Sequence, residues 1–276
     1  MILDVPIRSE VDVATEFESL GASSKPFVIK SGVPECKALT HWDIDYFEKT
    51  VDPALKVKVK RPKTELPNEY EYVDTGFGDL LTDWKTNPNS QQYLAGCGRQ
   101  VASLQDEVKV PSFIKDTKYP IFSQLWIGIN GFTPFHFHPG KHAFVCQLVG
   151  KKRFILAAPQ DTKHIYPYPW YSNFLNTSRI QDENLAEVNL NRFPKWKNIT
   201  LYDITLQPGD LLYIPPQWWH CVSINGFSAM CSYFWLGRLN SWMKSENSLR
   251  TLRAVWREHP WYVKSELKGL FGLKES

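Results

Sequence analysis

Residues 133–142 read TPFHFHPGKH and bring three histidines, His136, His138 and His142, into one short segment. The residues before and after this segment form apolar runs with the length and composition of β-strands. In an extended chain, residues i and i+2 lie on the same face, roughly 6–7 Å apart. The spacing therefore predicts that His136 and His138 share one ion, because imidazole is a ready ligand for iron, copper, zinc and manganese.

A second segment, PGDLLYIPPQWWH at residues 208–220, ends on another histidine. Pro208, Gly209 and Asp210 predict a turn, the next residues predict a strand, and His220 is expected to begin a further strand. Antiparallel strands that are distant in sequence become neighbours in a β-barrel, so His220 can reach the first two histidines. A single histidine in an apolar strand is usually a hydrogen-bonded core residue, but this combination predicts three metal ligands.

Short apolar or alternating runs from about residue 120 onward predict the fold class. They are FSQLWIGIN, HAFVCQLVG, KRFILAAP, NITLYDITL, DLLYIP and SAMCSYFWLG, and Gly, Pro and Asn separate them. Many short strands of this kind indicate a mainly β protein with a sandwich or barrel architecture. The N-terminal part adds mixed helical and extended elements, among them a helix that begins at Ser9. We expect one domain over residues 1–240 that includes this N-terminal elaboration.

Residues 241–276 are expected to form a C-terminal helical segment. The stretch SWMKSENSLRTLRAVWREHP has apolar residues at helical spacing, and Pro260 ends the pattern. A helix appended to a β core either packs on that core or makes a contact between two copies of the chain. The sequence leaves both readings open, so a homodimer through the C-terminal helices is one expectation.

The composition indicates a soluble, cytoplasmic protein. The 276 residues carry a net charge of +3, and the N-terminus has no apolar segment typical of a secretory signal. There is no apolar run of about 18 residues, so no membrane partner is expected. The five cysteines are odd in number and form no CxxC, which favours a reducing compartment. The lysines of KVKVKRPK, residues 56–63, are interpreted as solvated side chains of an edge strand, and no nucleic-acid partner is expected.

Around its histidines the chain resembles the cupins, and over most of its length it resembles the JmjC-type, cupin-like (cupin-8) 2-oxoglutarate oxygenases. Within that family its nearest likeness is to asparaginyl hydroxylases. The motifs that carry the resemblance are TPxH, a Q-x-x-G-x-K-R segment, IYPYP, NRFP, PGDLLYIPxxWWH and a final FW. They extend from about KPFVIKSGVP to SYFWLG and together are specific.

The resemblance implies a double-stranded β-helix (jelly roll) in which residues 1–240 form a catalytic domain, and it implies Fe(II) and 2-oxoglutarate as cofactors. It also implies hydroxylation or another oxidation of a peptide or small-molecule substrate. On the family's pattern, the first and last metal-binding histidines fall on His136 and His220. The cosubstrate-binding residues fall on Thr133, Lys152 and Tyr93, and the lysine would pair with the distal carboxylate of 2-oxoglutarate. A lysine facing an anion is a charge-assisted hydrogen-bond donor.

The chain departs from the family at one ligand. The family has H-x-D, whereas this chain has His136-Phe137-His138. Exchanging a carboxylate for an imidazole raises the net charge of an iron(II) site from about +1 to about +2, which favours anionic co-ligands. Three histidines still leave three positions of an octahedral ion open. Two of these suffice for 2-oxoglutarate and the third for dioxygen.

His142 decides between two alternatives, because the run from His136 to His142 also matches the first cupin motif with histidine in place of glutamate. Four imidazoles would leave only two positions on an octahedral ion. Such a site favours a 2-oxoglutarate-independent cupin dioxygenase, or copper, manganese or zinc in place of iron. A third possibility is a catalytically inactive family member that binds a metal. Trp219 and Trp235 are candidate walls of the pocket, although core packing suits each of them alone.

Overall fold

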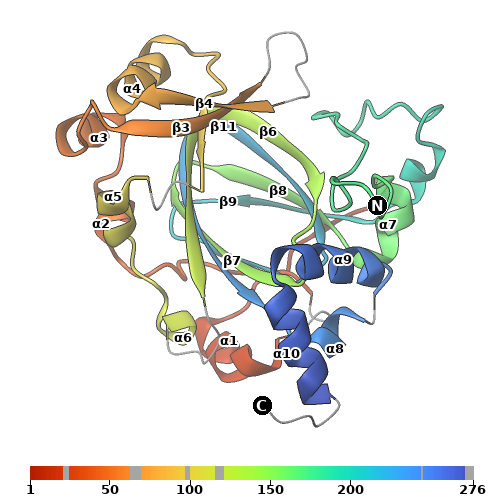
Figure 1. Cartoon of the computed structure of the whole chain (residues 1–276). Helices are drawn as coiled ribbons and strands as arrows, with labels where there is room; N and C mark the ends of the chain where they lie inside the picture. The colour runs from red at the N-terminus through yellow and green to blue at the C-terminus, as the bar shows by residue number, and fades with distance from the viewer. Residues whose placement is uncertain (21–24, 63–69, 97–99, 116–120, 244, 271–276) are drawn as a thin grey trace.

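The architecture is a strongly curved β-sheet with helices outside it, as a computed structural model of the chain shows (Figure 1). The structure describes residues 1–20, 25–62, 70–96, 100–115, 121–243 and 245–270. Its strands are β1 (Ile2–Asp4), β2 (Phe27–Ile29), β3 (Lys56–Pro62), β4 (Tyr70–Gly76), β5 (Tyr93–Ala95), β6 (Phe122–His136), β7 (Lys141–Val149), β8 (Lys152–Ala157), β9 (Leu201–Leu206), β10 (Leu211–Ile214) and β11 (Trp219–Leu236).

The strands follow the order β1-β9-β8-β11-β6-β5-β3-β4, and β10 pairs with β2 and β7. The central strand is β11, which pairs with β6 along most of its length. Its first half also pairs with β8 and its second half with β7. Register shifts after His220 and after Ile224 bend β11, as β-bulges do. The sheet curls around an interior, which confirms the double-stranded β-helix that the sequence predicts.

Alternate residues of these strands fill the interior of the curled sheet, which we call the barrel interior. Its buried apolar side chains include Val145, Phe154, Leu156, Leu212 and Phe234. Neighbouring residues on the same strands point to the other face, because side chains in a strand alternate. That opposite face of β7 and β11 packs against the N-terminal elements in a larger outer core, which includes Phe144 and Trp235. The two faces of β7 and β11 therefore belong to two different hydrophobic cores.

Helices lie mainly outside the sheet (Figure 1). They are α1 (Glu10–Glu16), α2 (Lys37–Thr40), α3 (Ile44–Thr50), α4 (Phe77–Thr86), α5 (Ala102–Asp106), α6 (Ser112–Lys115), α7 (Thr162–Ile165), α8 (Leu239–Trp242), α9 (Ser248–Glu258) and α10 (Pro260–Leu270). The helix expected at Ser9 is α1, whose N-terminal amides the Ser9 side chain caps by accepting from the Asp12 N–H. No helix that the structure describes is long and apolar enough to cross a membrane.

One local expectation is wrong, and another is incomplete. The KVKVKRPK segment is not an edge strand, because β3 lies between β4 and β5 and β4 forms the edge. Pro260 ends the α9 pattern, but it also begins a further helix, α10, since proline is tolerated in the first turn of a helix. Of the five cysteines, Cys97 lies outside the described residues, and the other four are free and buried.

Candidate metal centre

Three histidines lie close together where β6 ends and β11 begins. His136 is the last residue of β6 and pairs directly with His220 near the start of β11, and His138 follows two residues after His136. The ring centroids lie 4.2 Å apart for His136 and His220, 4.7 Å for His138 and His220, and 5.5 Å for His136 and His138. One ring nitrogen from each lies within 4.8 Å of the others, which is close enough for a shared ion.

Hydrogen bonds fix which nitrogen two of the histidines offer. His136 Nδ1 lies 2.9 Å from the Pro134 carbonyl oxygen, and His220 Nδ1 lies 3.1 Å from the Trp218 carbonyl oxygen. A carbonyl only accepts, so each Nδ1 carries the proton and each Nε2 offers its lone pair. Nδ1 of His138 is buried and has no hydrogen-bond partner among the residues that the structure describes. A buried nitrogen without a partner is costly, and a bound ion would satisfy it.

Burial keeps these imidazoles neutral. Desolvation lowers the pKa of His136 to about 4, against a weaker opposing effect of its bond to Pro134. Desolvation, and then repulsion from the neighbouring imidazoles, lowers the pKa of His138 and of His220 well below the usual value. No acidic side chain joins the group among the described residues. Three neutral nitrogen donors fit a first-row transition metal better than magnesium or calcium, which prefer oxygen.

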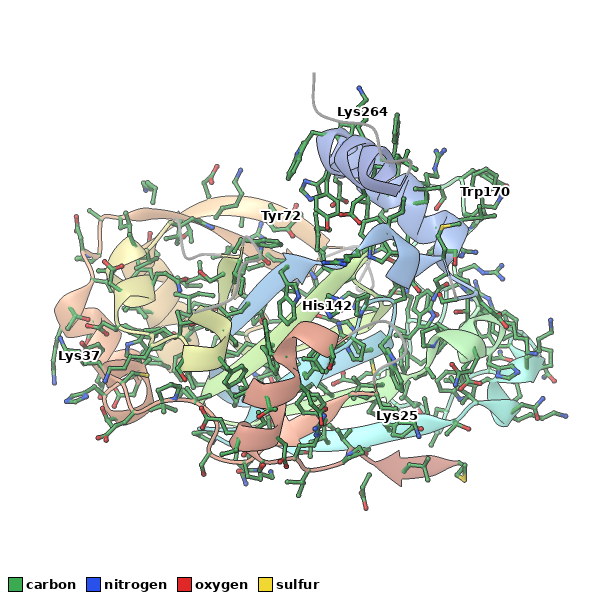
Figure 2. The ribbon with its side chains drawn as sticks, turned by 90° about the horizontal axis from the view of Figure 1, so that it is seen from below. Lys25, Lys37, Tyr72, His142, Trp170 and Lys264 are labelled. Atoms are coloured by element: carbon green, nitrogen blue, oxygen red, sulfur yellow. The ribbon has the colours of Figure 1, made fainter. Side chains whose placement is uncertain are left out.

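The structure places His142 away from this cluster. Its ring stacks on Trp235 at 4.8 Å with an interplanar angle of 6°, and its Nδ1 is 2.8 Å from the Tyr213 hydroxyl. Trp235 belongs to the outer core, whereas the adjacent Phe234 lies in the barrel interior and contacts His138 at 5.0 Å. His142 therefore lies on the opposite face of the sheet, near the centre of the molecule in Figure 2. Its expected role as a fourth ligand is corrected.

The two candidate pocket-wall tryptophans also face away from the barrel interior. Trp235 packs in the outer core against His142 and Phe144. Trp219 packs against Phe137 at 4.8 Å in a third core cluster outside the sheet. Both therefore have the packing role that the sequence left as an alternative.

The expected cosubstrate residues lie together near one end of the barrel interior. Lys152 is 1% exposed, and it shares its face of β8 with Phe154 and Leu156 of the barrel interior. Its Nζ donates to the Tyr93 hydroxyl at 3.2 Å. Tyr93 and Thr133 line one pocket, and Thr133 precedes His136 on the same strand. Burial lowers the pKa of Lys152 to about 7, so the side-chain amine readily takes up a proton and becomes charged when an anion approaches.

Three further residues of this region were missed by sequence reasoning. Lys60 and Tyr70 line the same pocket as Tyr93 and Thr133. Trp126 packs against the barrel interior with a buried indole N–H that has no partner, and its ring lies 6.1 Å from that of Tyr93. Only Lys60 carried a signal, its place in an alternating Lys-Val run, and that run was interpreted as solvated.

Comparisons with known proteins show the family of this chain. The chain matches the cupin-like domain family over residues 13–240. It is 37% identical over 142 residues to Jumonji C domain-containing protein 5 of Drosophila melanogaster, covering 49% of this chain and 34% of that protein. It is 32% identical over 221 residues to JmjC domain-containing protein D of Dictyostelium discoideum, covering 71% and 48%. It is 30% identical over 224 residues to Lysine-specific demethylase JMJ30 of Arabidopsis thaliana, covering 78% and 51%.

The matched regions make up about a third to a half of these relatives' own lengths. The matches agree with the JmjC-type resemblance that the motifs carry. The particular likeness to asparaginyl hydroxylases stays a prediction.

Proposed function

This chain belongs to the cupin-like, JmjC-type family, and we propose that it is a metal-dependent oxygenase that uses 2-oxoglutarate and dioxygen to oxidise a peptide or small-molecule substrate. The observation that carries the proposal is the combination of two sites. One is a set of three neutral histidines. The other is a fully buried lysine that faces the same barrel interior and forms no ion pair with any acidic side chain that the structure describes.

The number of ligands supports the use of 2-oxoglutarate. With His142 on the other face of the sheet, three histidines remain to hold an ion. On an octahedral ion they leave three positions, which is the number that 2-oxoglutarate and dioxygen need together. We take iron(II) as the ion, which when bound activates dioxygen for oxidation of the substrate. Copper, manganese and zinc are the alternatives that a set of imidazoles also suits.

The protein's own residues position the cosubstrate. Lys152 would donate to the distal carboxylate of 2-oxoglutarate from a buried site, where a charge-assisted hydrogen bond is strong. The Tyr93 hydroxyl, already bonded to Lys152, holds the ammonium in place and can share the same carboxylate. Thr133 offers a further hydroxyl from the pocket wall. Apolar side chains of the barrel interior keep bulk water from the region between these groups and the histidines.

Replacement of Lys152 by methionine should weaken binding of 2-oxoglutarate by about 10- to 100-fold. A hydrogen bond to a charged group contributes about 1.5–3 kcal/mol, and each 1.4 kcal/mol is about tenfold in affinity. In the wild type, affinity should fall as the pH rises above about 7, where free Lys152 loses its proton. Titration calorimetry of the iron(II) protein without oxygen measures both effects, and succinate release in air measures turnover.

Lys151→Met is the matched control, because Lys151 is the exposed neighbour of Lys152. It should leave the affinity and its pH dependence unchanged. Oxygen uptake without succinate would instead favour a cupin dioxygenase that does not use 2-oxoglutarate. Tight zinc binding without oxygen uptake or 2-oxoglutarate binding would favour an inactive metal-binding member of the family.

The C-terminal helices form an apolar surface that we propose holds a second copy of the chain. Met243, Leu249 and Trp256 are exposed by 52%, 67% and 48%, and they line one groove with Trp170. Trp170 lies beside the C-terminal helices in Figure 2. Exposure of such an apolar patch to water is unfavourable, and patches of this kind usually mark contacts with other proteins.

Leu249→Glu should therefore convert a dimer to a monomer in sedimentation velocity at micromolar concentration, because a buried unpaired carboxylate is costly. Leu190→Glu is the matched control, since Leu190 is an exposed leucine outside the groove. A wild-type protein that sediments as a monomer at all concentrations would contradict the dimer.

A further inference from the structure

Lys60 lies at the pocket beside the metal centre, on β3. It pairs with Tyr93 of β5 in the sheet register and lines the pocket together with Tyr70, Tyr93 and Thr133. The lysines at positions 56 and 58 on the same face of β3 are exposed, whereas Lys60 is partly buried. Lys60 is also close enough to His136 for its charge to lower the pKa of that imidazole.

Among the residues that the structure describes, no acidic side chain forms an ion pair with the Lys60 ammonium. The ammonium lies over the ring of Tyr70, whose centroid is 4.0 Å from Nζ, and the Tyr70 hydroxyl donates to the Phe132 carbonyl at 2.6 Å. None of the described residues that line the pocket is an aspartate or a glutamate. Glu183 acts electrostatically on Tyr70 but is exposed and makes no ion pair with Lys60. Desolvation lowers the pKa of Lys60, because keeping the ammonium charged in this partly buried position is unfavourable.

Tyr93 separates this ammonium from the second one. Lys152 reaches the Tyr93 hydroxyl from the barrel interior, and Lys60 lies across the strand pair from Tyr93 at the pocket. Two lysines and a divalent ion held by three neutral histidines give this region about four positive charges. A bound 2-oxoglutarate supplies two negative charges, so an excess of about +2 remains. A metal site with a carboxylate ligand would leave one positive charge fewer.

We propose that Lys60 binds an anionic group of the substrate, a carboxylate or a phosphate, beside the metal centre. The proposal rests on the proposed function, in which a substrate is oxidised beside the metal centre and the bound 2-oxoglutarate. The ammonium over Tyr70 donates to the anion and offsets the excess positive charge. The substrate class is therefore an organic acid or phosphate ester, or a peptide whose acidic side chain enters the pocket.

The structure argues against two simpler roles for Lys60. A solvated lysine would extend into water like its two exposed neighbours on β3, but Lys60 lies over an aromatic ring at the pocket wall. A second ligand for 2-oxoglutarate would duplicate Lys152, which is more deeply buried and already held by Tyr93. Lys60 is less exposed than Lys56 and Lys58 and less buried than Lys152, so it suits a second anion that binds after the cosubstrate.

The test measures anion binding in the zinc-loaded protein by titration calorimetry. Acetate and inorganic phosphate are titrated separately, with and without saturating 2-oxoglutarate, so the two probes distinguish a carboxylate from a phosphate. We expect Lys60→Met to weaken the preferred anion by about tenfold or more, and Lys60→Arg to restore it. Binding of 2-oxoglutarate should keep its affinity in Lys60→Met and weaken by about 10- to 100-fold in Lys152→Met. Lys58→Met, on the same face of β3, should match the wild type.

Equal affinity of the wild type and Lys60→Met for both anions would overturn the proposal. So would a loss of 2-oxoglutarate in Lys60→Met as large as that in Lys152→Met, because Lys60 would then belong to the cosubstrate site. If the wild type binds no 2-oxoglutarate, the proposed function fails. The Lys60-dependent affinity for the probe anions, measured in its absence, still decides this proposal separately.

Discussion

The His220→Ala protein should lose its metal, with an affinity more than about 100-fold below that of the wild type. Losing a group that only orients a metal ligand already lowers affinity by roughly 10- to 100-fold, and here a ligand itself is removed. His220 lies closest to both other histidines, at 4.2 Å and 4.7 Å between ring centroids, so its removal leaves two donors. Elemental analysis of protein purified with iron(II) or zinc measures the loss.

His142→Gln is the control for this experiment. The glutamine can keep a hydrogen bond to the Tyr213 hydroxyl, so the outer core stays satisfied while the imidazole is removed. Metal content should equal that of the wild type, because His142 faces Trp235 on the opposite side of the sheet. A loss of metal in His142→Gln with an unchanged melting temperature would contradict the three-histidine centre. Metal retained in His220→Ala would contradict it as well.

The strands of the barrel could be predicted because each one has its own apolar run and flanking turn residues within a short stretch of sequence. The short apolar run in HAFVCQLVG and the turn residues before DLLYIP indicate strands without knowledge of their partners. The pairing of β3 could not be predicted in this way. Its position between β4 and β5 depends on segments that are separated in sequence, and so does the burial of Lys60 against Tyr70. An alternating lysine pattern is compatible with an edge strand and with an internal one.

The error at His142 has a local cause. A continuous strand would place residues 138 and 142 on one face, because their numbers differ by four. The chain turns between them at Gly140, whose φ of +65° lies in the left-handed region, and β7 begins at the next residue. Trp242 fills the space where a side chain at position 140 would lie, at 2.9 Å from an ideal Cβ. The turn therefore resets the alternation and sends His142 to the outer core.

The substitution His138→Asp should keep a metal site and change its preference. Nδ1 of histidine lies two bonds beyond Cβ, as does a carboxylate oxygen of aspartate. The unpartnered Nδ1 of His138 therefore marks a position that an aspartate oxygen can reach. A carboxylate lowers the net charge of the centre by one and favours iron(II) and manganese over copper and zinc. We expect the ratio of iron(II) affinity to zinc affinity to rise by about tenfold or more. A charged interaction contributes about 1.5–3 kcal/mol, and each 1.4 kcal/mol is about tenfold in affinity.

The same variant connects the metal centre to Lys60. With aspartate at position 138 the positive excess in the pocket falls by about one charge, so the affinity for acetate or phosphate should fall without any change at Lys60. Turnover with iron(II) and 2-oxoglutarate should persist, because three ligands and three open positions remain. Competitive metal titration and anion calorimetry on the same preparation measure both effects. A variant that binds no metal would show that the site requires the imidazole, and unchanged anion affinity would show that charge at position 138 does not govern the pocket.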